Sequence, residues 1–257
     1  MALSALASQD DAAMRSDAAI VWREPAPIFL RPTRSDLRHS LARARLGAHD
    51  PLLDKEPGRS RAKRVFDVML AGAALVFFAP LLAAVAIAIK ATSQGPVLFT
   101  QYRYGYRNHR FRIYKFRTMY THLADRSGVR QTTDADPRIT AVGRLLRSTS
   151  LDELPQLLNV IRGDMSLVGP RPHVPGMLAA SMPYEHLVPY YFVRHVVRPG
   201  VTGLAQVSGY RGSTAEAQSA IGRISCDLEY IEKWSLWLDL RIIVRTAVRE
   251  FLSGSGS

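Results

Sequence analysis

Two adjacent carboxylates, Asp152 and Glu153, are the residues of this sequence whose types and spacing best suit catalysis. Leucine and isoleucine recur after them at helical spacing until Gly163, which predicts a helix ending at that glycine. With Asp152 as N-cap, Pro155 falls in the first turn, where its missing N–H does no harm. Free N–H groups and the helix dipole stabilise a carboxylate there by roughly 0.3–1 kcal/mol. Asp152 is therefore predicted to stay ionised as a nucleophile or metal ligand. A plain helix cap beside a solvated acid is the simpler alternative.

The chain of 257 residues is long enough for one large domain or two small ones, and it carries a formal net charge of +12. Such an excess of basic residues indicates a polyanionic partner: nucleic acid, an anionic membrane surface or a phosphorylated substrate. Cys226 is the only cysteine, which excludes an internal disulfide and a cysteine cluster for zinc. Residues 1–60 lack apolar periodicity and are predicted to form a disordered or loosely ordered basic extension, and residues 253–257 a flexible tail.

One stretch is apolar enough to enter a membrane. Residues 68–89 contain no charged side chain and would form about 33 Å of helix, enough to cross a hydrocarbon core. Pro80 lies near the middle and is expected to kink or break this helix. Basic residues flank both ends, a pattern typical of the cytoplasmic side. We therefore predict a re-entrant helix broken at Pro80, with a spanning helix and a buried core helix as alternatives.

A basic and aromatic segment follows. Residues 97–102 and 110–116 are rich in β-branched and aromatic residues and predict a hairpin. Six cations lie in or beside it: Arg103, Arg107, Arg110, Arg112, Lys115 and Arg117. This interleaving suits single-stranded nucleic acid, a nucleotide diphosphate or lipid phosphates, and it also fits a solvated basic face.

Two amphipathic helices are expected, one just before the acidic pair and one near the end of the chain. An apolar stripe from Ile139 to Leu146 predicts the first, which places Arg147 within reach of Asp152 as an ion-pair partner or phosphate ligand. Residues 227–252 predict the second, with Trp234 and Trp237 before a basic stripe of Arg241, Arg245 and Arg249. That arrangement indicates an interfacial helix on anionic lipid, or else a solvated face with tryptophans in the core.

Residues 61–252 resemble the bacterial sugar transferases, membrane-dwelling phosphoglycosyl transferases that load a sugar phosphate onto undecaprenyl phosphate. The matching stretches, in order, are KRVFD (63–67), GPVLFTQYRYG (95–105), KFRTM (115–119), DPRIT (136–140), LDELPQLLNVIRGDMSLVGPRP (151–172), RPGVTGLAQVSGYRG (198–212) and WSLWLDLRII (234–243). One departure is Ala79-Pro80, where the family usually has Ser-Pro at the helix break.

The resemblance implies an α/β fold, mainly α. A re-entrant membrane helix at 61–92, broken at Pro80, would join a small cytoplasmic α/β catalytic domain at 93–252 that carries interfacial amphipathic helices. It places the protein at the bacterial cytoplasmic membrane, with the catalytic domain on the cytoplasmic face. It implies no nucleic-acid partner, and a homodimer is one oligomeric state left open.

The resemblance also implies a mechanism in two steps. Asp152 would attack a UDP-sugar, with a hexose such as glucose or galactose favoured, and form an aspartyl–phosphosugar with loss of UMP. Undecaprenyl phosphate would then take the sugar phosphate and start an exopolysaccharide repeat unit. Glu153 would position groups or accept a proton, and Mg²⁺ would bind near Asp152 and Glu153. The expected substrate and phosphate contacts are Lys115, Arg117, Arg147, Asp164, Arg171, Gln206 and Arg211.

Two other functions stay in view. A catalytically silent membrane scaffold of the same fold could organise a polysaccharide assembly complex, although the intact acidic pair and Arg171 argue against it. A nucleic-acid-binding protein would leave the uncharged run of residues 68–89 and the acidic block unexplained.

Overall fold

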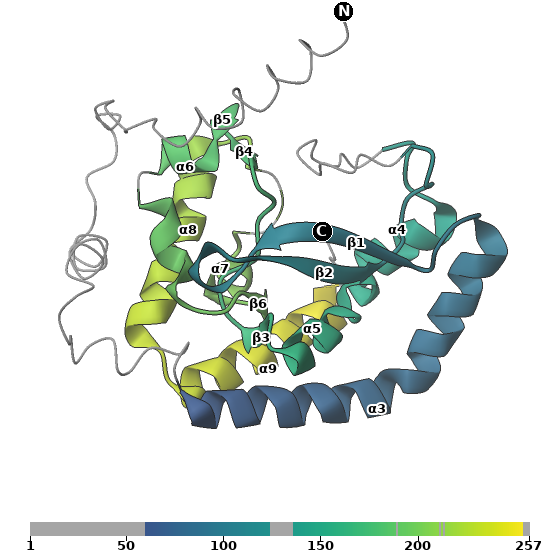
Figure 1. Ribbon diagram of the computed structural model, residues 1–257, viewed down its shortest axis with the longest axis horizontal. Coiled ribbons are helices and arrows are strands. Elements are labelled where there is room, and N and C mark those ends of the chain that lie inside the picture. The colour runs from purple at the N-terminus through teal and green to yellow at the C-terminus, as the bar shows by residue number, and fades with distance from the viewer. Residues whose placement is uncertain (1–59, 124–135, 189, 211, 213, 254–257) are drawn as a thin grey trace, which may run out of the picture. The chain divides into compact units, whose positions relative to one another are not determined.

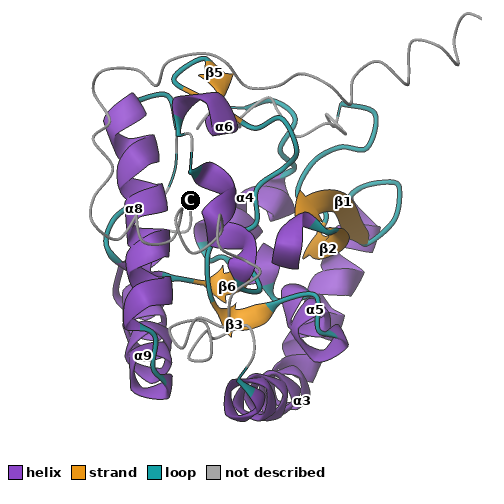
Figure 2. Ribbon diagram, turned by 60° about the vertical axis from the view of Figure 1, so that its left-hand side comes forward, coloured by secondary structure: helices purple, strands orange, loops and turns teal. Residues whose placement is uncertain are grey.

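The computed structural model describes residues 60–123, 136–188, 190–210, 212 and 214–253, all within the compact unit Pro32–Ser257. Apart from Ser60 and Ser253, the predicted extension 1–60 and tail 253–257 lie outside this range. The described chain is mainly helical (Figures 1 and 2), in agreement with the predicted α/β class.

The α-helices are α3 (Arg61–Thr92), α4 (Ala141–Ser148), α5 (Gln156–Arg162), α6 (Tyr184–Leu187), α7 (Leu204–Val207), α8 (Ala217–Lys233) and α9 (Leu236–Ser253). Short 3₁₀ turns are η2 (Tyr106–Asn108), η3 (Leu151–Glu153) and η4 (Tyr191–Val196). The strands are β1 (Leu98–Tyr104), β2 (Arg110–Phe116), β3 (Ser166–Val168), β4 (Leu178–Ala179), β5 (Met182–Pro183) and β6 (Gly200–Thr202). β1 pairs antiparallel with β2, β4 antiparallel with β5, and β3 parallel with β6.

Helix α3 is the long apolar helix that the sequence predicts. Ser60 caps it, because its hydroxyl oxygen accepts from the Lys63 amide at 3.2 Å. The helix is assigned as continuous through Pro80, and its ribbon bends along its length (Figure 1). By length and composition it can cross a membrane, and only 11% of its most apolar 18-residue stretch is buried in the protein. The break at Pro80 and the re-entrant path stay predictions.

The predicted hairpin is confirmed. Tyr102 lies opposite Arg112, Arg103 opposite Phe111, and Phe99 opposite Lys115. Because side chains alternate between faces along a strand, Arg103 and Lys115 share the face that carries the buried Ile113. One face of the hairpin therefore turns toward the protein core, and it carries two of the six cations.

Two apolar clusters support these elements. The larger joins α5, α8, β3 and the segment before β6, with Val160, Val168 and Ile224 among its fully buried members. The smaller packs Val85 and Ile89 of α3 against Phe116 and Leu146. The C-terminal part of α3 is thus fastened to β2 and α4.

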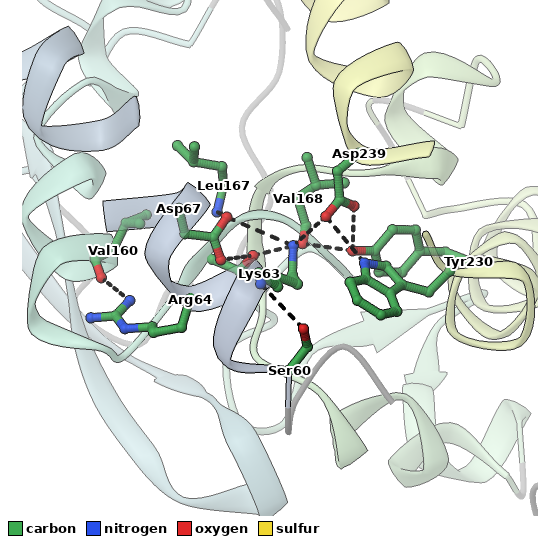
Figure 3. A network of polar contacts seen from close by, with 11 residues as sticks. Ser60, Lys63, Arg64, Asp67, Val160, Leu167, Val168, Tyr230 and Asp239 are labelled. Carbon is green, nitrogen blue, oxygen red and sulfur yellow. Dashed lines mark hydrogen bonds and ion pairs between the residues drawn. The ribbon is translucent and has the colours of Figure 1, made fainter. Parts of the chain in front are cut away.

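The N-terminal turns of α3 are held by a buried polar network (Figure 3). Lys63 Nζ donates to Asp239 Oδ2 of α9 at 2.7 Å and lies 3.7 Å from Asp67 Oδ1. Asp67 accepts from the Ser166 hydroxyl at 2.8 Å and the Leu167 amide at 3.2 Å. This network ties α3, β3 and α9 together. It gives a structural role to Asp67 of the KRVFD motif and to Asp239 of the WSLWLDLRII motif.

The predicted helical tail of residues 227–252 is confirmed, but it is divided between two helices. Helix α8 ends at Lys233, and α9 restarts at Leu236 because the Ser235 hydroxyl caps it by accepting from the Leu238 amide at 3.1 Å. Trp234 turns inward and donates to Asp239 at 3.1 Å, whereas Trp237 is 65% exposed. Helix α9 therefore buries one face and exposes an apolar stripe made of Trp237, Leu240, Val244 and Val248.

Candidate active site

The acidic pair lies in the 3₁₀ turn η3, not at the N-terminus of α5, so the prediction that Asp152 caps this helix is wrong. An N-cap side chain bonds the amide two or three residues on. Here the Leu154 amide donates to the Leu151 carbonyl, and Pro155 has no N–H to offer. The predicted helix end is confirmed, since Gly163 adopts a left-handed φ of 95°.

A strained residue sets the direction of the turn. Ser150 has a φ of 54°, a left-handed conformation that costs a non-glycine residue roughly 1–3 kcal/mol. Its carbonyl accepts from the Glu153 amide at 3.1 Å, which closes the turn between α4 and α5. Backbone strain of this kind concentrates at functional sites.

Glu153 is clamped by two cations. Lys115 Nζ lies 2.6 Å from its Oε1, and Arg171 donates from Nη2 to Oε1 at 2.5 Å and from Nη1 to Oε2 at 3.0 Å. Burial alone would raise the pKa of Glu153, but Arg171 and Lys115 outweigh burial and hold this pKa well below its ordinary value. Glu153 is therefore a permanent anion that fixes two cations, and a poor proton acceptor.

Asp152 has different surroundings. Its side chain is buried, with 8% of the residue exposed, and no described residue donates a hydrogen bond to its carboxylate. Burial raises the pKa of Asp152, Glu153 raises it further, and Lys115, Arg147 and Arg171 act in the opposite direction. Asp152 is thus a weakly solvated carboxyl group among cations.

Arg171 is held by its backbone as well as by Glu153. The Gly169 amide donates to the Thr202 carbonyl, and the Gly200 amide to the Pro170 carbonyl, both at 2.9 Å. A Cβ on Gly200 would lie 2.1 Å from the Gly169 nitrogen, so this close approach requires glycine. The LVGPRP and RPGVTG motifs are thus paired through their backbones. This pairing fixes the backbone just before Arg171 and helps to hold its guanidinium group in place.

Arg103 is a member of the site that the sequence assigned only to a general basic patch. Its guanidinium donates to Gln101 Oε1 at 2.7 Å and to the Pro172 carbonyl at 3.4 Å. Burial, followed by the neighbouring charge of Arg171, lowers the pKa of Arg103 to about 10, and Glu153 acts in the opposite direction. The signal in the sequence was the alternation of side chains along the hairpin strands, which puts Arg103 on the same inner face as Lys115.

Arg117 has other partners. Its guanidinium donates to the carbonyl oxygens of Ser93 at 2.8 Å and Gln94 at 2.6 Å, and to the Ser93 hydroxyl at 2.9 Å. It is buried and secures the C-terminal end of α3 to β2. Among the described residues, these contacts give Arg117 a structural position, and its predicted phosphate contact stays untested.

Three further predicted residues lie apart from the clamp or outside the described range. Asp164 accepts from Asn159 Nδ2 at 3.2 Å, and Asn159 in turn bonds the backbone of β2. The side-chain nitrogen Nε2 of Gln206 donates to the Val201 carbonyl at 3.2 Å. Arg211 lies outside the described residues. Asn159, which fastens Lys115's strand to α5, was not predicted and has no distinctive sequence signal.

Metal binding would depend on the substrate. Within the described ranges, no group of three or more His, Cys, Asp or Glu side chains could hold an ion by itself. Both oxygens of Glu153 already accept from cations, so Asp152 is the carboxylate that fits a metal ligand. Mg²⁺ is often held by one or two carboxylates together with substrate phosphates, and Asp152 suits that mode.

The chain is similar to known proteins over about three quarters of its length. Residues 58–253 match the pattern of the family described as bacterial sugar transferase. The chain is 52% identical over 194 residues to the "Exopolysaccharide production protein PSS" of Rhizobium leguminosarum bv. phaseoli, covering 76% of this chain and 97% of that protein.

Two further relatives are named for glucose. The "Undecaprenyl-phosphate glucose phosphotransferase" of Komagataeibacter xylinus is 49% identical over 191 residues, and the match covers 74% of this chain but only 36% of that longer protein. The "UDP-glucose:undecaprenyl-phosphate glucose-1-phosphate transferase" of Caulobacter vibrioides is 48% identical over 208 residues, covering 78% of this chain and 76% of that protein. The match of the family pattern to three quarters of the sequence settles the family: this chain belongs to the bacterial sugar transferases.

Proposed function

We propose that the protein transfers a sugar 1-phosphate from a UDP-sugar to undecaprenyl phosphate and so starts an exopolysaccharide repeat unit. The observation that carries this proposal is the contrast within the acidic pair. Glu153 is saturated by Lys115 and Arg171, whereas Asp152 is buried beside the same cations without a hydrogen bond from a described residue. The names of the relatives support the donor and acceptor classes, and glucose is the sugar that two of them name.

The proposed chemistry has two displacements at one phosphorus. An Asp152 oxygen forms a bond to the sugar-bearing phosphorus while the bond to the nucleotide phosphate breaks, and UMP leaves with that electron pair. A phosphate oxygen of the lipid then forms a bond to the same phosphorus, which releases the Asp152 carboxylate. Neither displacement needs a net proton transfer, because each exchanges one phosphate or carboxylate anion for another.

The geometry supports a positioning role for Glu153. A carboxylate whose pKa is held far below its ordinary value cannot serve as an efficient proton acceptor near neutral pH. By fixing Lys115 and Arg171 within 3.0 Å of its own oxygens, Glu153 instead pre-organises two cations for phosphate oxygens.

We also propose that Mg²⁺ assists. Asp152 would hold the ion together with the donor phosphates, and a bound ion would offset the charge that accumulates on those phosphates. The side chains of Lys115, Arg147 and Arg171 supply the remaining positive charge around Asp152.

The membrane location of the proposed enzyme rests on exposed apolar surface. Along α3, Val65, Met69, Val76, Phe77 and Ile87 are each more than 60% exposed. Such a surface on one helix marks contact with lipid or another apolar partner. We propose that α3 dips into the cytoplasmic membrane and returns, with the apolar stripe of α9 on anionic lipid and the active site on the cytoplasmic face.

Single-cysteine labelling tests this path, in a Cys226→Ser background that removes the native cysteine. Ala62→Cys and Ala91→Cys lie at the two ends of α3, and both positions are exposed. A re-entrant helix predicts that a membrane-impermeant thiol reagent labels both from the same side of sealed vesicles. Labelling from opposite sides would establish a spanning helix and refute the proposed path.

Release of UMP tests the activity. Detergent-solubilised full-length protein is given Mg²⁺, undecaprenyl phosphate and, in separate reactions, UDP-glucose, UDP-galactose or UDP-N-acetylgalactosamine. We expect turnover with one hexose donor, dependence on the lipid, and no turnover by Asp152→Asn. Glu229→Gln, which removes a carboxylate from an exposed ion pair with Lys233, is the matched control and should be fully active. Folded protein that is inactive with every donor in this assay would refute the proposal.

A further inference from the structure

Arg103 has no role in the function proposed above, although its side chain extends the cationic side of the site. It lies on the inner face of the hairpin, four positions along from Lys115's place in the strand register, or roughly 13 Å at strand spacing. Arg171 connects the two, since it bonds Glu153 beside Lys115 while the next residue's carbonyl accepts from Arg103. The cations therefore form a row of Lys115, Arg171 and Arg103, in which the first two meet at Glu153 Oε1 and Arg103 lies beside Arg171.

Two features of Arg103 are unfavourable in the protein alone. Its Nε is buried and has no hydrogen-bond partner among the described residues. Its charge also repels that of the neighbouring Arg171. Buried donors are normally satisfied, and like charges are tolerated when an anion joins them. Both costs would be relieved by one phosphate group held between the two guanidinium groups.

The charge balance agrees with such an anion. Four cations act on the acidic pair, namely Lys115, Arg103, Arg147 and Arg171, against the two carboxylates. This surplus of positive charge favours an anionic ligand, and a nucleoside diphosphate sugar carries one negative charge on each phosphate. The sugar-bearing phosphate must lie at Asp152, so the nucleotide-side phosphate falls further along the row.

We infer that Arg103 and Arg171 together bind the nucleotide-side phosphate of the donor, which departs as the phosphate of UMP. This inference rests on the proposed transferase function. Gln101, whose Oε1 accepts from Arg103 Nη2 at 2.7 Å, is a positioning residue for this site. A purely structural role for Arg103, joining the hairpin to the Pro172 carbonyl, is the alternative that the experiment must separate.

The test compares UMP with uridine, which differ only by the phosphate. Inhibition constants of both are measured against the donor for wild type, Arg103→Gln, Arg103→Lys and Arg112→Gln. Arg112→Gln is the matched control, because it removes the same charge from the opposite, exposed face of the same hairpin. There the Arg112 side chain stacks on Tyr102. Losing hydrogen bonds to a charged group should weaken UMP binding by about 10- to 100-fold in Arg103→Gln.

The pattern of results decides. We expect Arg103→Gln to lose affinity for UMP and not for uridine, Arg103→Lys to recover part of it, and Arg112→Gln to resemble wild type within about twofold. If Arg103→Gln unfolds, Arg103→Lys alone carries the comparison, because loss of the bidentate donor should still weaken UMP selectively. Unchanged UMP affinity, or equal losses for UMP and uridine, would overturn the inference. Active wild type in the same assay keeps this outcome separate from failure of the proposed function.

Discussion

Replacing Glu153 by glutamine is the perturbation whose consequences the structure determines most fully. The change keeps the size of the side chain and removes the charge that holds Lys115 and Arg171 through three contacts of 2.5–3.0 Å. Removing one partner of a buried ion pair costs about 3–5 kcal/mol. Because 35% of the Arg171 side chain is exposed and solvent screens its charge, we expect a smaller loss than this, about 2–3 kcal/mol.

The pH dependence of this difference gives the sharper test. The pKa of Glu153 is held below its ordinary value of 4.5 in the folded protein, so its stabilisation is fully present above that pH. The stabilisation is lost as the pH falls through the folded pKa. The gap in free energy of unfolding between wild type and Glu153→Gln should therefore be constant from pH 8 to about 5 and shrink below about 4.5.

Thermal unfolding followed by circular dichroism in a mild detergent measures this gap across the pH range. Glu229→Gln, at an exposed ion pair, serves as the control and should shift the midpoint little at any pH. A Glu153→Gln protein as stable as wild type at pH 7, or a gap that persists unchanged to pH 3, would refute the clamp.

Three further predictions follow from individual contacts. Asp239→Ala removes the 2.7 Å partner of buried Lys63 and should lower the free energy of unfolding by about 3–5 kcal/mol in a denaturant titration; a loss below 1 kcal/mol would contradict the network. Arg117→Met should lower the melting temperature and leave the KM for the donor unchanged, because its bonds go to the end of α3; a raised KM with normal stability would return Arg117 to the phosphate site. Cys226, whose pKa is raised to about 11 by burial and by its acidic neighbours, should be alkylated at pH 8 at least 100-fold more slowly than free cysteine; an ordinary rate would disprove that environment.

Patterns with a strong local cause were predictable from the sequence. The hairpin followed from β-branched and aromatic residues on either side of a turn, and the end of α5 followed from Gly163. The ion pair between Lys63 and Asp67 joins side chains four residues apart on the same helix. Such features depend on neighbours in the chain, so spacing alone reveals them.

Features that depend on one missing backbone hydrogen bond, or on partners far away in the sequence, were not predictable. Asp152 fits an N-cap by residue type, but the missing N–H of Pro155 and the left-handed Ser150 produce a separate turn. The basic stripe of the last helix seemed uniform, yet Arg249 donates to the Gln206 carbonyl while Arg241 and Arg245 are exposed. The six cations of the hairpin segment likewise have different positions, which the fold decides.

The family resemblance contributed what local chemistry could not. Residue types alone left the basic and aromatic segment open between nucleic acid, nucleotide and lipid, and only the order of the matching motifs favoured one of them. The clamp on Glu153 and the place of Arg103 needed the structure, because three separate segments meet there: the hairpin, the turn at Glu153 and the loop at Arg171.

The central claim is that Asp152 carries the sugar phosphate between the two substrates. The direct measurement is mass spectrometry of the protein after incubation with Mg²⁺ and the UDP-sugar, without the lipid. We predict one hexose phosphate per chain, located on the peptide that contains Asp152, released on addition of undecaprenyl phosphate and absent from Asp152→Asn. Turnover of UDP-sugar and lipid by an enzyme that never acquires this mass, or by Asp152→Asn at the wild-type rate, would contradict the account.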